Sequence, residues 1–226
     1  MARSVVLKPS RRCARCQLTE RWCVCAGVRE TTCPVQVDVL MHFMESYRPS
    51  STGHLLQRVL PTSRQFIFRK ERALTRDDIV LPGRELWILH PNGEPPPSGA
   101  DPAQLQVLLI DGTWVQSTEM LRTIGGWGRR VSLPMEGESR YWLRTQAGPG
   151  RFSTMEALLF LLQSLGLHES HEALRLQFEL HVYGSLRARG HKQQAQEFLA
   201  GSPLAAAMPE VIAGLDAPRQ PGMLQG

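Results

Sequence analysis

The sequence predicts an α/β domain with a largely parallel sheet, preceded by a small cysteine-rich module. Short apolar runs alternate with helical or loop segments from residue 34 onward, which is the pattern of a parallel sheet with flanking helices. The composition, 42% hydrophobic and 21% charged over 226 residues, is that of a folded soluble protein. This length supports one main domain with a real core and an appendage.

Five short strands are expected along the chain. The first begins after Pro34, and apolar residues occupy every second position, at Val35, Val37, Val39, Met41 and Phe43. Since most residues between them are also apolar or uncharged, this strand is predicted to be mostly buried. The other four are predicted at 65–68, 86–89, 106–110 and 130–133.

Helices are predicted between and after these strands. A short helix over 55–60 ends at Pro61. The proline-rich segment 94–99 is expected to be a stiff extended connector. The sequence Ser153-Thr154-Met155-Glu156 has the form of a capping box before an apolar run, which predicts a buried helix. A second helix is expected over about 170–189.

The chain is therefore divided into a cysteine module over 1–33, the main α/β domain over 34–200 and a C-terminal tail over 201–226, weakly ordered at its end. No stretch approaches the roughly 18 consecutive apolar residues of a membrane helix. The first eight residues lack the apolar segment of a signal peptide. We expect a cytoplasmic protein without a membrane partner.

Four cysteines have the spacing of a metal site. Cys13, Cys16, Cys23 and Cys25 form the pattern Cys-x2-Cys-x6-Cys-x-Cys in a segment too polar to build its own core. Zinc binds four thiolates tetrahedrally, and such a closed site holds shape rather than performing chemistry. Disulfides are less expected in a reducing cytosol, and a redox pair usually opens a helix after a strand. Cys33 lies outside the pattern and is expected to be an ordinary buried residue.

The positive charge of the chain is concentrated beside these cysteines. Residues 1–30 contain seven Lys or Arg against Glu20 and Glu30, and this surplus of five equals the net charge of the whole chain. Such a segment suits a phosphate-backbone partner, because neutralised phosphates release counterions. The alternative is a solvated basic tail. The residues expected to contact RNA are Arg11, Arg12, Arg15 and Arg21.

The tetrapeptide Asp111-Gly112-Thr113-Trp114 follows the apolar run 105–110 directly. It therefore delivers a carboxylate, a hydroxyl and an indole to the end of a buried strand, where open α/β sheets bind ligands. A core position would not select Asp there, because burying a carboxylate without a partner is costly. Trp114 is either part of the core or a stacking surface for a nucleobase.

Further candidates have a plain structural explanation beside the functional one. Thr52 and Gly53 stand where a loop enters a helix, which suits anion binding, although a hydroxyl there can also simply cap the helix. Arg144 could grip a carboxylate through its guanidinium, or cover Trp142 with its stem. The capping box 153–156 has a sufficient structural reason to exist.

Residues near the end of the first strand carry less information. His42 and Glu45 lie there, and a lone His or Glu is usually structural. A pair of histidines at 168 and 171 is expected to be solvated on a helix rather than to bind a metal.

Several motifs in order resemble the DTW-domain family, over about residues 13–200. They are the cysteine pattern, His42-Phe43-Met44-Glu45, Ser51-Thr52-Gly53, Leu108-Leu109-Ile110-Asp111-Gly112-Thr113-Trp114, Tyr141-x-Leu143-Arg144 and Ser153-Thr154-x-Glu156-Ala157. The Asp-x-Thr-Trp signature of the family is present as Asp111, Thr113 and Trp114. The family often has Thr-Asn-Thr-Gly where this chain has Ser50-Ser51-Thr52-Gly53, so an Asn amide is replaced here.

The resemblance implies a tRNA-uridine aminocarboxypropyltransferase, related to the SPOUT superfamily of knotted α/β enzymes that bind S-adenosylmethionine. It therefore implies a SPOUT-like sheet with a trefoil knot. The bacterial branch modifies a uridine in the tRNA variable loop. The implied product is 3-(3-amino-3-carboxypropyl)uridine, with methylthioadenosine released.

The resemblance also suggests roles for individual residues. Asp111 is the first candidate for the base that takes the N3 proton of uridine, and it could instead hold the ammonium group or ribose of the donor. The residues expected to bind donor or substrate are Thr52, Gly53, Thr113, Trp114, Arg144, Ser153, Thr154 and Glu156. Two other classes stay open: a SPOUT-type RNA methyltransferase using the same donor, and a non-catalytic zinc-ribbon protein that binds RNA.

Overall fold

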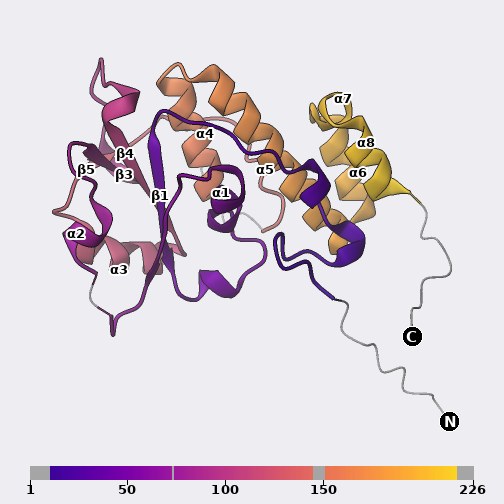
Figure 1. Ribbon diagram of the computed structural model, residues 1–226, viewed down its shortest axis with the longest axis horizontal. Coiled ribbons are helices and arrows are strands. Elements are labelled where there is room, and N and C mark those ends of the chain that lie inside the picture. Colours follow the sequence, from indigo (N-terminus) through magenta and orange to yellow (C-terminus); the bar gives the residue numbers. More distant parts are fainter. Residues whose placement is uncertain (1–10, 73, 145–150, 218–226) are drawn as a thin grey trace, which may run out of the picture.

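The computed structural model describes residues 11–72, 74–144 and 151–217, and it is built around a five-stranded sheet (Figure 1). The strands have the order β2-β1-β4-β3-β5, and every neighbouring pair is parallel. Their bounds are Gln36–His42 for β1, Gln65–Phe68 for β2, Glu85–Glu94 for β3, Leu105–Asp111 for β4 and Arg129–Val131 for β5. The predicted α/β class with a parallel sheet is therefore confirmed. The trefoil knot stays a prediction.

Helices cover both faces of this sheet. Their bounds are Gly53–Val59 for α1, Arg76–Ile79 for α2, Trp114–Ile124 for α3, Thr154–Ser164 for α4, His168–Ala188 for α5, Lys192–Ala200 for α6, Leu204–Ala207 for α7 and Pro209–Asp216 for α8. Single 3-10 turns lie at Glu20–Trp22 (η1), Cys25–Gly27 (η2), Glu45–Tyr47 (η3) and Pro102–Gln104 (η4). In the described part of the chain, no helix has the length and apolarity to cross a membrane.

Two apolar cores lie on opposite faces of the sheet. Alternate residues of β1 show why: Val39 packs into a larger core shared with α1, α4 and α5, whereas Leu40 packs into a smaller core shared with α2 and α3. Because both faces are covered, β1 is buried at every position after Gln36. The sheet therefore forms the middle layer of three (Figure 1).

The segment after Leu89 differs from the prediction. The strand was predicted to end at Leu89, but β3 continues to Glu94, the first residue of the predicted extended connector. Its register with β5 shifts between Leu89 and Glu94. The sequence did not predict this extension, because it contains Pro91 and Asn92, and both residue types are rare in strands. Gly93 permits it: a Cβ there would lie 2.6 Å from the backbone carbon of Val131 in β5.

The cysteine module packs against α5 (Figure 1). Leu18 and Val24 are buried. A Cβ added to Gly184, in the C-terminal part of α5, would lie 2.4 Å from Val24 Cγ1 and 3.2 Å from Leu18 Cδ1. This glycine lets the module approach the helix backbone closely. The module therefore shares the larger core of the α/β domain.

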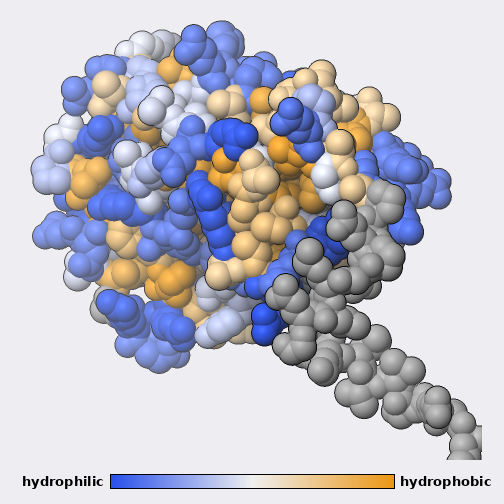
Figure 2. Space-filling view, turned by 45° about the vertical axis from the view of Figure 1, so that its right-hand side comes forward, coloured by the Kyte–Doolittle hydropathy of each residue, from blue (hydrophilic) through white to orange (hydrophobic). Residues whose placement is uncertain are grey.

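The described part of the predicted tail is helical. Leu204, Ile212 and Leu215, on α7 and α8, are buried in the larger core. Residues 218–226 lie outside the described residues. Figure 2 shows hydrophilic residues and hydrophobic patches interspersed on the side of the molecule that carries these helices.

Candidate active site and metal site

Asp111 is the last residue of β4 and lies beside Met41 of β1 in the register of the sheet. Its side chain turns toward the layer of α1 and α4. The Ser51 hydroxyl donates to its Oδ2 at 2.5 Å, and the Thr154 hydroxyl donates to its Oδ1 at 3.0 Å. Asp111 is only 6% exposed. Two hydroxyl groups from distant segments therefore hold one buried carboxylate.

Burial raises the pKa of Asp111 above the usual carboxyl range. The two hydroxyl donors and the nearby Arg144 oppose this shift, while the charge of Glu45 adds to it. Gly53 packs directly against the carboxylate, since a Cβ at this position would lie 2.7 Å from Asp111 Oδ2. Neither Ser51 nor Thr52 caps α1 through its side chain: the Ser51 hydroxyl is used on Asp111 instead.

A second buried carboxylate, Glu45, organises the cations of the site. It follows β1 and is fully buried, and the guanidiniums of Arg48 and Arg144 each donate to it at 2.7 Å. The Arg144 guanidinium also lies 5.9 Å from the ring centroid of Tyr141. The Tyr141 hydroxyl donates to the Ser50 carbonyl, which fixes the loop that carries Ser51.

Two adjoining cavities open beside Asp111. The first, which we call the polar cavity, has a volume of about 370 Å³, and its polar and charged lining includes Arg48, Thr52, Asp111, Tyr141, Arg144 and Arg151. The second, the apolar cavity, has a volume of about 170 Å³, and its lining includes Leu89, Ile110, Val131, Leu133, Met135 and Ala157. Both are lined by Gly112, Trp114, Arg151, Phe152, Ser153 and Thr154. A ligand with one charged end and one apolar end could therefore span the two.

The structure brings most of the predicted site residues to these cavities. Thr52 lines the polar cavity, and its hydroxyl oxygen accepts from the backbone N–H of Met155 at 3.3 Å. Thr113 also lines it and caps α3. Trp114 is 51% exposed at the shared wall, with the Arg151 guanidinium 5.5 Å from its ring centroid. The indole is therefore not a core residue.

Gly53 and Glu156 line neither cavity. The Glu156 carboxylate is buried and accepts from the Ser139 hydroxyl, from the backbone N–H of Arg140 and from that of Ser153. The protein therefore supplies hydrogen-bond donors to both oxygens of the Glu156 carboxylate. In this arrangement Glu156 holds the start of α4 against the segment that carries Tyr141.

Sequence reasoning missed several residues of the site. Glu45 was expected to be structural, Ser51 was considered only as part of the helix start or its cap, and Tyr141 was given no role, although all three stand in the motifs quoted above. Their place in those motifs was the available signal. Arg48 and Arg151 had no such signal.

The four predicted cysteines form a compact cluster. Their Sγ atoms all lie within 4.8 Å of one another, with Cys13 and Cys25 at 3.6 Å and Cys16 and Cys23 at 3.7 Å. Four thiolates about 2.3 Å from a tetrahedral zinc would lie roughly 3.8 Å apart, so the cluster fits that ion. Cys33 lies outside it, and burial raises the pKa of its thiol. The cluster could hold a metal such as zinc.

The basic residues of the module have different surroundings. Arg11 and Arg15 are exposed, and Arg12 donates to the Gln17 carbonyl at 2.9 Å. Arg21 lies over the Trp22 ring at 4.2 Å and donates to the Ala217 carbonyl. Arg21 therefore ties the module to the end of α8. Residues 1–10, with their two further cations, lie outside the described residues.

Comparison with known proteins identifies a family that fits this arrangement. Residues 10–185 match the model of the DTW domain, a span that includes the cysteine cluster, both cavities and most of α5. No solved structure matches the chain. Since the match covers most of the sequence, the chain belongs to the DTW domain family.

Proposed function

We propose that this protein transfers the 3-amino-3-carboxypropyl group of S-adenosylmethionine to N3 of a tRNA uridine and releases methylthioadenosine. Membership of the DTW domain family is consistent with a tRNA-modifying enzyme. One observation carries the proposal further: a buried carboxylate with a raised pKa, Asp111, opens onto a cationic cavity that adjoins an apolar one.

The two cavities match the two ends of the donor. Its amino-acid end carries a carboxylate and an ammonium group, for which Arg144 and the hydroxyls of Thr52 and Thr154 offer partners in the polar cavity. Its adenine has two flat faces that can pack against the apolar side chains of Leu89, Leu133 and Phe152. The sulfonium would then lie near the wall shared by the cavities, beside Gly112 and Ser153.

The proposed reaction needs a base and a displacement. Uridine N3 loses its proton to Asp111, and the freed electron pair forms a bond to the donor carbon attached to sulfur. The S–C bond breaks with its electron pair going to sulfur, so neutral methylthioadenosine leaves. A base is most effective when its pKa is near the working pH, and burial moves the pKa of Asp111 in that direction.

Orientation decides which group is transferred. An aminocarboxypropyltransferase must turn the amino-acid arm of the sulfonium toward the RNA and keep the methyl group against protein. Placing that arm in the polar cavity, next to Asp111 and the half-exposed Trp114, supports this orientation. An exposed indole is also a suitable stacking surface for the incoming base.

The cysteine module would contribute shape and RNA contacts. Cys13, Cys16, Cys23 and Cys25 would hold a zinc ion whose four positions are all taken by sulfur, which supplies rigidity to a segment without a core of its own. The exposed Arg15 would then be presented to tRNA phosphates.

Product analysis tests this function. Purified protein is incubated with an unmodified tRNA transcript and S-adenosylmethionine, and nucleosides and small products are identified by mass spectrometry. We expect aminocarboxypropyl-uridine together with methylthioadenosine. A methylated nucleoside with S-adenosylhomocysteine would instead identify a methyltransferase. RNA binding without donor binding in calorimetry would identify a non-catalytic RNA-binding protein.

A further inference from the structure

A third cavity lies between the cysteine module and the loop after β1. It has a volume of about 430 Å³, and we call it the basic cleft. One wall is formed by Arg15, Cys16 and Gln17 of the module, and the other by Tyr47, Arg48 and Arg58 around η3 and α1. The two segments also lie near each other in Figure 1.

The electrostatics of the basic cleft favour an anion. No Asp or Glu is among its lining residues, whereas three arginines are. Glu45 lies behind Arg48, but it is shared with Arg144, so one carboxylate faces two guanidiniums and one positive charge is left over. Arg15 is exposed to solvent, and the Arg48 side chain is 45% exposed. These cations are accessible to a phosphate.

An exposed aromatic ring stands in the same cleft. Tyr47 is 71% exposed, and within the described residues it has no aromatic or cation–π partner. This exposure leaves the ring free for contact with a partner, and tyrosine suits such contacts because it combines an apolar ring with a polar hydroxyl. A tyrosine face can stack on any nucleobase, and a positive groove beside it follows the backbone.

The basic cleft adjoins the candidate active site. Arg48 lines both the cleft and the polar cavity, where Asp111 lies. A strand of RNA that enters between the module and η3 would therefore reach the polar cavity without leaving the protein surface.

The opposite side of the module is less suitable for RNA. The depression lined by Arg11, Arg21, Arg187 and Lys192 also contains Glu20 and Asp216. Arg21 and Arg187 both lie over the Trp22 ring, and Arg187 forms an ion pair with Asp216. Two acidic residues therefore offset two of the four cations in this depression, whereas no acidic residue lines the basic cleft.

We propose that the basic cleft binds the single-stranded nucleotides next to the reacting uridine, with a base stacked on Tyr47 and phosphate held by Arg15 and Arg48. This inference rests on the proposed tRNA substrate. It assigns substrate positioning to Tyr47 and Arg48, and of the predicted RNA-binding arginines it selects Arg15 and excludes Arg21.

Equilibrium binding of an unmodified tRNA transcript tests the cleft. Fluorescence anisotropy is measured over a range of salt concentrations for the wild type and the variants Tyr47→Ala, Tyr47→Phe and Arg15→Gln, with Lys192→Gln as the matched control in the other depression. We expect Tyr47→Ala to weaken binding on the order of 10-fold and Tyr47→Phe to bind like the wild type. Arg15→Gln should lower the log–log salt slope by roughly 0.7, whereas Lys192→Gln should not.

Two further measurements separate the failure of the cleft from the failure of the proposed reaction. Metal content shows whether Arg15→Gln has damaged the neighbouring cluster, and calorimetry with S-adenosylmethionine reports donor binding. If the wild type modifies tRNA but Tyr47→Ala and Arg15→Gln bind it unchanged, the cleft proposal is wrong and the reaction stands. If RNA binding depends on the cleft but no uridine is modified, the cleft proposal stands and the proposed reaction is wrong. A change of oligomeric state instead of RNA affinity in Tyr47→Ala would also overturn the cleft.

Discussion

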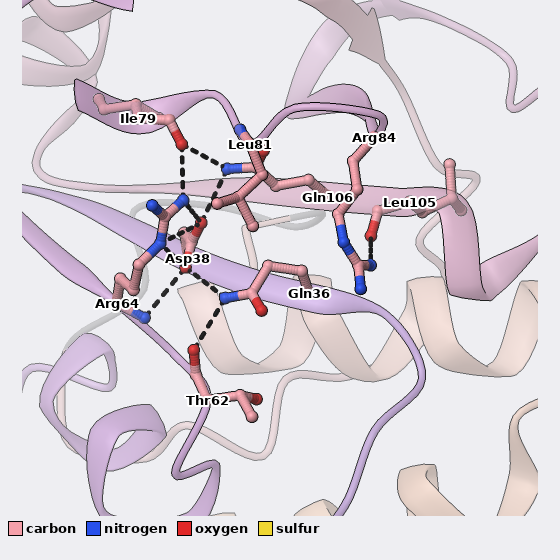
Figure 3. A network of polar contacts seen from close by, with 9 residues as sticks. All are labelled: Gln36, Asp38, Thr62, Arg64, Ile79, Leu81, Arg84, Leu105 and Gln106. Carbon is pink, nitrogen blue, oxygen red and sulfur yellow. Dashed lines mark hydrogen bonds and ion pairs between the residues drawn. The ribbon is translucent and has the colours of Figure 1, made fainter. Parts of the chain in front are cut away.

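Two buried aspartates on neighbouring strands, Asp38 of β1 and Asp111 of β4, have opposite surroundings. Asp38 is fully buried on the face covered by α2, and Figure 3 shows its carboxylate at the centre of a polar network. Asp111 is 6% exposed on the face covered by α1 and α4. Residue type and burial are thus similar, although Asp38 lies near the start of its strand and Asp111 at the end of its own. The difference in chemistry lies in the donors around each carboxylate.

The Asp38 carboxylate is satisfied entirely by the protein. Arg64 donates to it from its backbone N–H and from its guanidinium, with Nη2 at 2.6 Å from Oδ2. The side-chain amides of Gln36 and Gln106 each donate at 2.8 Å. Arg64 and Gln106 also donate to the Ile79 carbonyl, which ties the end of α2 to the sheet. This carboxylate has no open position for a ligand.

Among the described residues, only the hydroxyls of Ser51 and Thr154 donate hydrogen bonds to the Asp111 carboxylate, which opens onto the polar cavity. No cation donates to it within the described residues. Hydroxyls stabilise a negative charge less than a guanidinium does, so burial dominates and the pKa rises. A complete set of protein donors therefore makes a buried carboxylate structural, whereas an incomplete set leaves it available for chemistry.

The largest expected effect is on the rate of the Asp111→Asn variant. Replacing the proposed base with an isosteric amide should lower kcat by roughly 10²- to 10⁴-fold, the usual contribution of a positioned acid or base. Product formation and donor binding are measured on the same tRNA. Weaker donor binding with little change in kcat would mean that Asp111 holds the donor's ammonium group instead.

The same variant should not lose stability at neutral pH. Because the pKa of Asp111 is raised in the folded state, the native protein binds its proton more tightly than the unfolded chain does. The wild type therefore loses stability relative to Asp111→Asn as pH rises from the ordinary carboxyl value through the raised one. Urea unfolding from pH 4 to pH 8 measures this difference, and a variant less stable at pH 8 than at pH 4, relative to wild type, would contradict it.

Asp38→Asn should instead lower stability and leave activity close to normal. It removes one partner of a buried ion pair and leaves the Arg64 guanidinium without its counter-charge, a change that costs about 3 kcal/mol of unfolding free energy. The Arg64 side chain is 33% exposed, which keeps the cost at the lower end of the usual range. Chemical denaturation measures the loss, and catalysis by the folded variant should be close to normal. A folded Asp38→Asn variant without activity would contradict a purely structural role for Asp38.

Gly53→Ala tests how closely the backbone must approach Asp111. The new Cβ would lie 2.7 Å from Asp111 Oδ2 and 2.8 Å from Met41 Cε, so the carboxylate or α1 must move. We expect a loss of about 1–3 kcal/mol of unfolding free energy, together with reduced activity. Gly214→Ala is the matched control, because a Cβ there meets nothing within 4 Å. Equal effects of the two substitutions would show that the site does not require the close approach of the Gly53 backbone to Asp111.

The smallest effect is expected for Ser51→Ala. Losing one hydroxyl donor should cost about 1 kcal/mol of stability and raise the pKa of Asp111 further, because that hydroxyl stabilises the charged form. The acid limb of the pH–rate profile should therefore move to higher pH. Ser164→Ala is the control, since its hydroxyl donates only to the Leu161 carbonyl of α4. An unchanged acid limb in Ser51→Ala would argue that another group limits the rate at low pH.

Local patterns in the sequence were sufficient for the strands, for the capped helix α4 and for the cysteine cluster. Each of these depends on neighbours within about 15 residues: apolar alternation in β1, the Ser153 capping box, and the four thiolates between 13 and 25. The continuation of β3 to Glu94 and the helices after residue 201 were missed, because packing against β5 and α5 overrode their proline- and glycine-rich composition.

By itself the sequence determined that a carboxylate, a hydroxyl and an indole end the buried strand β4, and that four cysteines could share one metal. Only the tertiary structure decided that Asp111 is held by Ser51 and Thr154, which lie 60 and 43 residues away, and that Glu45 pairs with Arg144. It also decided that Asp38 is fully satisfied and Asp111 is not. The cost of a buried charge depends on which donors packing brings beside it, and the spacing of those donors along the chain does not indicate that they will meet.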